Sequence, residues 1–158
     1  MDCFVVDTNV AVVANDRDTH VDISCCRSCV QKIRSMMRGG VIVLDEMGLI
    51  MNEYGNQLKF AGAPGVGDSF FKYLFDRQHG SSRVRRVAVT FSSDQQKGFL
   101  ELPENKLDPS DRKFLAVAVV SGAVIVNATD SDWSEQQELM DSLGVKIEQL
   151  CPDYACKP

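Results

Sequence analysis

The chain has 158 residues, which is the size of one ordinary domain, so we expect a single domain over residues 1–158. Apolar residues make up 44% of the sequence and charged residues 25%, which predicts a packed globular core and excludes a disordered chain. No run approaches the roughly 18 apolar residues that a membrane span needs, and the N-terminus lacks the pattern of a signal peptide, so the expected location is cytoplasmic. The net charge of −5 does not attract nucleic acid as a whole, and such a ligand requires a local basic patch.

Short apolar runs that indicate buried strands alternate along the chain with a three-or-four-residue apolar spacing that indicates helices. In chain order the pattern predicts a strand over residues 3–6, a helix over 21–37, a strand over 41–44, a helix over 45–60, a loop over 61–67, a helix around 70–75, a strand over 84–91, a helix over 110–121, a strand over 123–126, a helix over 133–143 and a strand over 145–150. This alternation predicts an α/β fold with a central parallel sheet.

Carboxylates stand beside several of these elements. Asp7 and Asp130 follow predicted strands, Asp111 begins a predicted helix, and Glu53 lies about two turns into the helix after the second strand. Because ligands bind at the carboxyl ends of parallel strands, we expect these side chains to reach one edge of the sheet. Carboxylates beside a core are costly to desolvate and repel one another, and a hard divalent cation removes that repulsion. The sequence therefore predicts a metal-dependent enzyme that uses Mg²⁺ or Mn²⁺.

Each carboxylate also has a structural alternative. Asp7 fits a helix N-cap, and Asp111 lies where a negative charge suits a helix dipole. Glu53 can be solvated at the edge of a helix face, and Asp130 can belong to an Asx-type turn. In the helix that contains Glu53, Asp45 is the expected cap.

The order and spacing of these motifs resemble those of PIN-domain ribonucleases, the group that includes the VapC toxins of bacterial toxin–antitoxin pairs. The opening Asp-x-Asn motif of the family is matched by Asp7-Thr8-Asn9, its helical glutamate by Glu53, and its aspartate before an alanine-rich helix by Asp111. Its closing Thr-x-Asp-x-Asp-aromatic motif is similar to residues 127–133, which contain Asp130 and Asp132. This closing stretch is one residue longer than usual, so the resemblance does not rank Asp130 and Asp132.

The resemblance implies a three-layer α/β/α fold, a divalent metal and endonucleolytic cleavage of RNA. It also implies a partner antitoxin for many members of the group, and we expect a homodimer. The chemistry of phosphodiester hydrolysis agrees, because it requires charge neutralisation at the phosphate and an activated water.

Roles for the individual side chains follow from this chemistry. The expected metal ligands are Asp7, Asp111 and Asp130, with Asp132 as a further candidate. Glu53 either binds metal or accepts a proton from the attacking water. Asn9 or Thr129 orients a water or a carboxylate from outside the ligand set. No histidine lies in any of these motifs, which disfavours a histidine general base.

Basic residues gather at two places. Arg83, Arg85 and Arg86 either contact RNA phosphates or form the solvated entrance of a strand. Arg112 and Lys113 directly follow Asp111 and are the second candidate for RNA binding.

Two rival functions remain open. The first is a non-catalytic PIN-like module that binds RNA or protein. The second is a phosphatase-like or receiver-type α/β domain with an acidic pocket, but a receiver needs a central phospho-acceptor aspartate after its third strand and a later lysine. Asp94 comes too late for that role, and no lysine matches.

Six cysteines leave three interpretations open. Buried or incidental thiols are the favoured one, because a chain without an export signal is expected in a reducing compartment. The alternatives are a zinc site and a disulfide or redox pair. The residues concerned are Cys25, Cys26 and Cys29 on a predicted helix, and Cys151 and Cys156 near the end of the chain.

Overall fold

The computed structural model describes residues 1–17 and 20–156 and contains a five-stranded sheet in which every neighbouring pair of strands is parallel. The strand order is β3-β2-β1-β4-β5, with β1 at the centre. The strands are β1 (Cys3–Val6), β2 (Val41–Asp45), β3 (Val84–Val87), β4 (Val124–Asn127) and β5 (Ile147–Gln149). The predicted parallel α/β sheet is confirmed.

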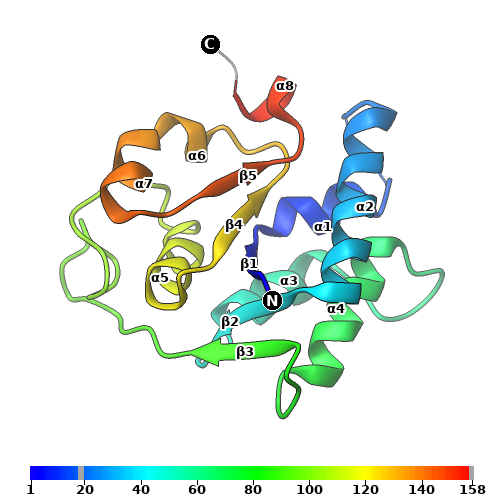
Figure 1. Ribbon diagram of the computed structural model, residues 1–158, viewed down its shortest axis with the longest axis horizontal. Coiled ribbons are helices and arrows are strands. Elements are labelled where there is room, and N and C mark those ends of the chain that lie inside the picture. The colour runs from blue at the N-terminus through cyan, green and yellow to red at the C-terminus, as the bar shows by residue number, and fades with distance from the viewer. Residues whose placement is uncertain (18–19, 157–158) are drawn as a thin grey trace.

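Helices cover both faces of this sheet (Figure 1). They are α1 (Thr8–Ala14), α2 (Ile23–Gly39), α3 (Leu49–Gln57), α4 (Val66–Arg77), α5 (Arg112–Ser121), α6 (Asp132–Glu135), α7 (Gln137–Leu143) and α8 (Pro152–Ala155). The chain runs outward from β1 to β2 and β3, and then crosses back to β4 and β5. Since parallel crossovers are right-handed, α1 to α4 lie on one face and α5 to α7 on the other. This is the three-layer α/β/α arrangement that the resemblance to PIN domains implies.

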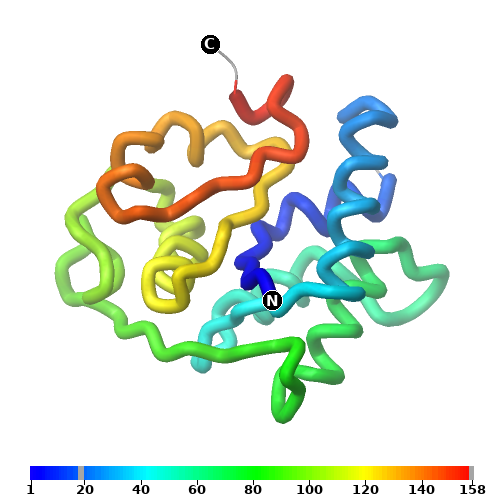
Figure 2. The backbone as a smooth tube through the Cα atoms, viewed as in Figure 1, coloured from blue at the N-terminus to red at the C-terminus, as the bar shows by residue number. Residues whose placement is uncertain are grey.

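The reversal of strand order falls between β1 and β4, where the first and second halves of the chain meet (Figure 2). Such a switch point opens a crevice at the carboxyl ends of the two strands. Asp7 lies directly at this point, because its backbone N–H donates to the carbonyl oxygen of Val126 at 3.0 Å. The topology therefore brings the end of β1 next to the end of β4.

The core lies on both sides of the central strands. Val5 of β1 and Ile125 of β4 are completely buried, as expected for strands covered on both faces. Ala116 and Ala118 of α5 are also buried, and their small side chains let this helix pack closely against β1, β2 and β4. Within the described residues, no helix is long and apolar enough to cross a membrane.

Several element boundaries differ from the prediction. The third strand ends at Val87, and the apolar residues beyond it belong to an irregular segment closed by a bridge between Phe91 and Phe99. The helix predicted over 133–143 is interrupted at Gln136, whose ψ of 30° is not helical. Helix α8 was not predicted, since four residues carry too little periodicity to be recognised.

The helix predicted from residue 45 begins four residues later. Asp45 is instead the last residue of β2, and its carboxylate accepts hydrogen bonds from the backbone N–H groups of Leu49 and Ile50 at 2.8 and 2.9 Å. Gly48, with a φ of 82°, forms the left-handed turn that this arrangement requires. Gly48, and not Asp45 as predicted, therefore occupies the N-cap position of α3, while the Asp45 carboxylate accepts two of the first backbone N–H groups of the helix.

Candidate metal centre

Three of the predicted carboxylates meet at the switch point. Asp7 precedes α1, Asp111 precedes α5, and Asp130 lies in the loop after β4. One carboxylate oxygen from each lies within 4.8 Å of the others. Residues separated by more than a hundred positions in the sequence thus share one acidic cluster, which we call the aspartate cluster.

Asp7 is the most rigidly held member of the cluster. It is 5% exposed, and one oxygen accepts a hydrogen bond at 2.8 Å from the indole N–H of Trp133, which is completely buried. Its other oxygen accepts the backbone N–H of Asn9 at 3.3 Å, so Asp7 is also the N-cap of α1. Burial raises the pKa of Asp7 to about 6, against the opposing effect of these two hydrogen bonds and with added repulsion from Asp130 and Glu53.

Asp111 has no comparable donors. It occupies the N-cap position of α5, but its side chain makes no capping hydrogen bond, and it is only 7% exposed. Burial, followed by the negative charges of Asp7 and Asp130, raises the pKa of Asp111 to about 8. Burial is also the largest cause that raises the pKa of Asp130, which is only half-buried. The cluster therefore holds more negative charge than its protein surroundings neutralise.

In contrast to the aspartate cluster, the other two buried acids of the described residues accept several hydrogen bonds. Asp45 and Asp68 are each 2% exposed, and Asp45 caps α3. Burial acts to raise the pKa of Asp68, but its hydrogen bonds hold that pKa below the usual range. Its donors are the backbone N–H groups of Lys59 and Gly65 and the side chains of Asn15 and Arg17. A buried acid in a structural role is thus paired in this protein, and the aspartate cluster is not.

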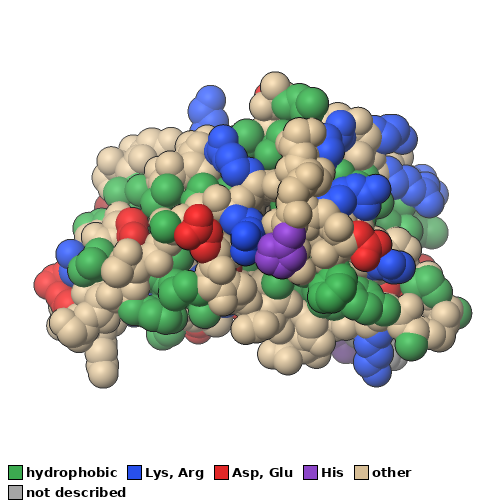
Figure 3. Space-filling view, turned by 90° about the horizontal axis from the view of Figure 1, so that it is seen from below, with side chains coloured by type: hydrophobic (Ala, Val, Ile, Leu, Met, Phe, Trp, Pro, Cys, Tyr) green, Lys and Arg blue, Asp and Glu red, His purple; other side chains and the backbone are tan. Residues whose placement is uncertain are grey.

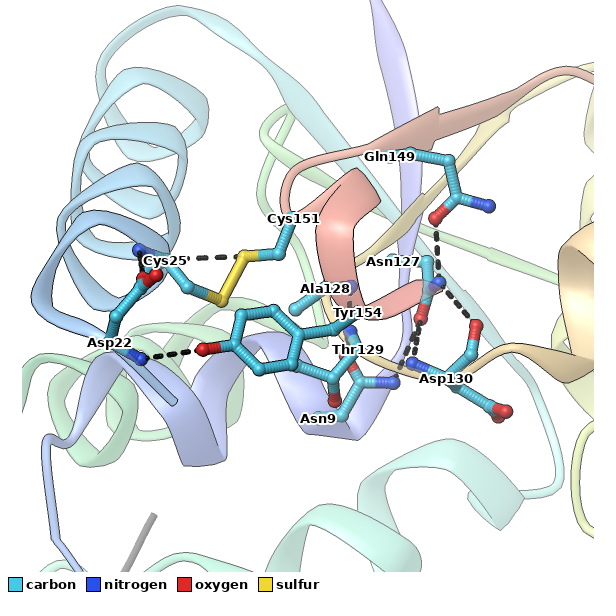
Figure 4. The surroundings of a disulfide bond; sticks show 10 residues. All are labelled: Asn9, Asp22, Cys25, Asn127, Ala128, Thr129, Asp130, Gln149, Cys151 and Tyr154. Carbon is cyan, nitrogen blue, oxygen red and sulfur yellow. Dashed lines mark hydrogen bonds between the residues drawn. A yellow bond between two sulfur atoms is a disulfide. The ribbon is translucent and has the colours of Figure 1, made fainter. Parts of the chain in front are cut away.

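A frame of amide side chains fixes the loop that carries Asp130 (Figure 4). The side chain of Asn9 donates to the Oδ1 of Asn127 at 2.9 Å and accepts the backbone N–H of Ala128 at 2.9 Å. Asn127 in turn donates to the carbonyl oxygen of Asp130 at 2.8 Å and to the side chain of Gln149 at 2.7 Å. Asn9 therefore acts on the backbone of the loop.

Glu53 lies beside the cluster but has partners of its own. Its Oε1 forms a salt bridge with Lys113 at 2.7 Å, and its Oε2 accepts the hydroxyl of Thr8. The lysine side chain is 13% exposed and that of Glu53 is 27% exposed, so water screens this ion pair only partly. Lys113 is thus engaged with an acid of the site.

The remaining predicted residues near the cluster lie outside it. Asp132 donates its backbone N–H to the carboxylate of Asp130 at 2.9 Å, and its own side chain is not among the three that converge. Thr129 contributes a backbone N–H toward Asn9 at 3.4 Å. The structure thus places the carboxylate of Asp130, and not that of Asp132, against Asp7 and Asp111.

The arginines predicted to bind RNA are placed as follows. Arg83 donates to two carbonyl oxygens at the C-terminal end of α2, at 3.0 and 3.1 Å, and Arg85 donates to the carbonyl oxygen of Ser121 at 3.3 Å. These carbonyls precede β2 and β4. Both guanidinium groups therefore lie at the amino ends of the strands, whereas the aspartate cluster lies at their carboxyl ends. Arg86 is exposed on β3. Basic side chains are spread across the face of the molecule below β3 (Figure 3).

The guanidinium of Arg112, which was predicted to bind RNA, forms hydrogen bonds within the chain. It donates to the side chain of Asn105 at 3.1 Å and to the carbonyl oxygen of Gln95 at 2.7 Å. It therefore ties the irregular segment after β3 to the start of α5.

Three residues of the site were not predicted from the sequence. Trp133 was placed on a helix and at the aromatic position of the closing motif, and Thr8 and Asn127 lay within the matched motifs, but none of the three was given a role in the site. The aromatic residue that closes the family's last motif was a signal for Trp133. Thr8 and Asn127 gave no signal, because their partners Glu53 and Asn9 are distant in the sequence.

The favoured interpretation of the cysteines as free thiols is wrong for two of them. Cys25 of α2 and Cys151, which precedes α8, form a disulfide with a Cα–Cα distance of 5.3 Å (Figure 4). Cys26 and Cys29 are buried free thiols, and burial raises the pKa of Cys29 to about 12. The pairing was not predictable because the two cysteines are separated by 126 positions.

Comparison with known proteins gives little guidance. No protein-family model and no curated protein matches the chain. Among solved structures, the chain is similar to one in the crystal structure of VapBC2 from Rickettsia felis bound to a DNA fragment from their promoter. The identity is 14%, the match covers 93% of this chain and 98% of that one, and the TM-score is 0.48.

Proposed function

We propose that this protein is a PIN-like, metal-dependent endoribonuclease that hydrolyses phosphodiester bonds of RNA. The observation that carries the proposal is the convergence of Asp7, Asp111 and Asp130 within 4.8 Å at the switch point of a parallel sheet. Such a position is where α/β proteins bind ligands, and three carboxylates together form a donor set for a hard cation.

The residues present fit a bound Mg²⁺ or Mn²⁺. Burial and mutual repulsion raise the pKa values of Asp7 and Asp111 to about 6 and about 8, and a divalent ion supplies the missing positive charge. When bound, the ion neutralises charge on the phosphate and makes a water more acidic. Asp7, Asp111 and Asp130 hold the ion in this proposal. Asp132, the fourth predicted ligand, acts through its backbone N–H.

Other groups of the chain position these carboxylates. Trp133 fixes the orientation of Asp7, and Asn9 fixes the loop of Asp130 through Ala128 and Asn127. Glu53 is held by Thr8 and Lys113, and we propose that it orients a water at the margin of the aspartate cluster. With Glu53 so paired, Lys113 serves the site as a counter-ion.

RNA requires cations near the cluster, since the chain carries a net charge of −5. Lys106 is exposed near the cluster, beside a hollow of about 210 Å³ whose other charged residues are Asp108, Asp132 and Glu135. We propose that Lys106 contacts an RNA phosphate from outside this acidic hollow. Of the predicted arginines, Arg86 stays a candidate contact, whereas Arg83 and Arg85 bind carbonyl oxygens of helix ends.

The test is cleavage of a fluorescently labelled single-stranded RNA by the purified protein. We expect cleavage with Mg²⁺ or Mn²⁺, none in EDTA, and a loss of about 100-fold or more in the Asp111→Asn variant. Asp141→Asn is the matched control, because Asp141 is exposed on α7, away from the aspartate cluster, and its carboxylate accepts a hydrogen bond only from Gln137. Cleavage that persists in EDTA would refute the metal mechanism, and RNA binding without cleavage would favour the non-catalytic PIN-like module.

An antitoxin partner and a homodimer remain predictions of the sequence. An apolar surface lies between α3 and α4, where Phe60 and Phe75 are 43% and 51% exposed. A protein partner could cover these rings. Phe60 stacks on Phe71 at 4.7 Å and meets Phe75 edge-on at 5.2 Å between ring centroids. Beside these rings lies a hollow of about 490 Å³. We propose this surface as the interface with a protein partner.

A further inference from the structure

Three buried cysteines lie together at the N-terminal end of α2, away from the aspartate cluster. Cys25 and Cys29 are four residues apart on the helix and therefore share a face. Cys151 faces them from the segment between β5 and α8, and the three sulfur atoms lie within 4.8 Å of one another. Their exposures are 4%, 0% and 4%.

Only two of these sulfurs are used by the disulfide. Cys25 and Cys151 are bonded, and Cys29 stays a free thiol beside them. A covalent link between α2 and the C-terminal segment needs no third sulfur. Cys29 is completely buried on the helix face that carries Cys25, and its sulfur brings the number of potential soft metal ligands to three.

The disulfide can be reached from solvent. Cys25 and Cys151 line a hollow of about 80 Å³ at the surface, with Asp22 and Tyr154 at its rim, whereas Cys29 does not line it. A small dithiol can therefore transfer two electrons and two protons to the disulfide, and it becomes a disulfide itself. The product is a group of three neighbouring buried thiols.

We propose that, once the disulfide is reduced, Cys25, Cys29 and Cys151 form a binding site for Zn²⁺. Each thiol releases its proton to solvent, and the three thiolates bind the ion. Zn²⁺ in proteins prefers four donors, and the hollow beside Cys25 and Cys151 has room for a water, which occupies about 30 Å³ in the liquid. The positive end of α2, whose first turn carries Cys25, favours the negative charge of this site.

The disulfide and the metal exclude each other. When a disulfide compound oxidises the site, it takes two electrons from the sulfurs of Cys25 and Cys151, the bond between them re-forms, and Zn²⁺ leaves. In the oxidised state a disulfide joins α2 to the C-terminal segment, and in the reduced state the bound metal joins them.

Co²⁺ is the probe for the test, because thiolate ligands give it a charge-transfer absorption that carboxylates do not. The full chain is reduced with a phosphine under argon, freed of reductant and titrated with Co²⁺, and Zn²⁺ is then added in competition. We expect the absorption to saturate at one Co²⁺ per chain, to vanish on Zn²⁺ addition, and to be absent in the oxidised protein. If the reduced protein shows no such absorption, the proposal is overturned.

Cys29→Ser and Cys26→Ser are the matched pair of variants. Both residues are buried free thiols of α2, but only Cys29 belongs to the group of three. We expect Cys29→Ser to lose the absorption and Cys26→Ser to keep it, with circular dichroism confirming that each variant is folded. Absorption unchanged in Cys29→Ser, or lost in Cys26→Ser, would assign the metal to other ligands. If Cys29→Ser does not fold, Cys151→Ser replaces it with the same expectation.

Discussion

Replacement of Asp111 by Asn should stabilise the protein while it removes one carboxylate of the aspartate cluster. The pKa of Asp111 is about 8 in the folded chain, against an ordinary value of 3.8. Below pH 3.8 the group is protonated in both the folded and the unfolded chain, so it has no effect on stability there. Between pH 3.8 and about 8 the unfolded chain releases the proton and the folded chain retains it, so the free energy of unfolding falls as the pH rises. Above pH 8 this loss is complete.

The size of the effect follows from the shift. Each pKa unit corresponds to about 1.4 kcal/mol, so the full shift of about four units sets an upper limit of about 6 kcal/mol at pH 8. Water reaches the half-buried Asp130 and screens part of the repulsion, and burying the new amide costs about 1–3 kcal/mol. We therefore expect Asp111→Asn to raise the free energy of unfolding by about 2 kcal/mol at pH 8 and by less than about 1 kcal/mol at pH 5.

The assay is urea unfolding in chelator at both pH values, followed by the fluorescence of Trp133, the only tryptophan, which is completely buried. Asp68→Asn is the control with the opposite sign. Burial acts to raise the pKa of Asp68, but its hydrogen bonds hold that pKa below the usual range, so its variant should lose stability at both pH values. A stability difference between Asp111→Asn and the wild type that does not grow from pH 5 to pH 8 would refute the reasoning.

Three further changes test the surroundings of the site. Trp133→Phe removes the donor to Asp7, so we expect the pKa of Asp7 to rise above about 6 and the free energy of unfolding, measured by circular dichroism in guanidinium, to fall by about 2–4 kcal/mol. Arg83→Gln removes hydrogen bonds to the end of α2 and should cost about 1 kcal/mol in thermal unfolding, while the salt dependence of RNA affinity stays unchanged; a flatter dependence would return Arg83 to the RNA path. Phe75→Ser should convert a dimer into a monomer in light scattering if the surface between α3 and α4 is covered by a second copy, and an unchanged mass would remove that surface from consideration.

The sequence was sufficient for the sheet because its strands are covered on both faces. Apolar runs such as the one that ends at Val6 are continuous, and their length distinguishes them from helices. The order of the strands was not predictable, because it depends on which edge of the sheet each crossover reaches. The predicted strand over 84–91 was too long, because the apolar residues beyond Val87 belong to a segment in which Phe91 bridges and packs on Phe99, with ring centroids 5.4 Å apart.

The acids of the site were predictable, and most of their partners were not. Asp7, Asp111 and Asp130 each stand next to an element boundary, which is a local signal. The partners are non-local: Lys113 reaches Glu53 across 60 positions. Lys113, which lies two residues after Asp111, was therefore predicted to bind RNA, and in the fold it forms a salt bridge with Glu53.

What separates the aspartate cluster from an ordinary set of caps is the distribution of cations around it. Arg17 pairs with the buried Asp68 at 2.9 Å, and Lys113 pairs with Glu53 at 2.7 Å. Within residues 1–17 and 20–156, no lysine or arginine forms a salt bridge with any of the three clustered aspartates. Among the described residues, a cation thus pairs with the buried Asp68 and another with Glu53 at the margin of the site, but none pairs with the three clustered aspartates, where repulsion is greatest. A fold in which these aspartates were only caps would be more stable with that charge neutralised, and this argument supports the proposal that a divalent cation binds there.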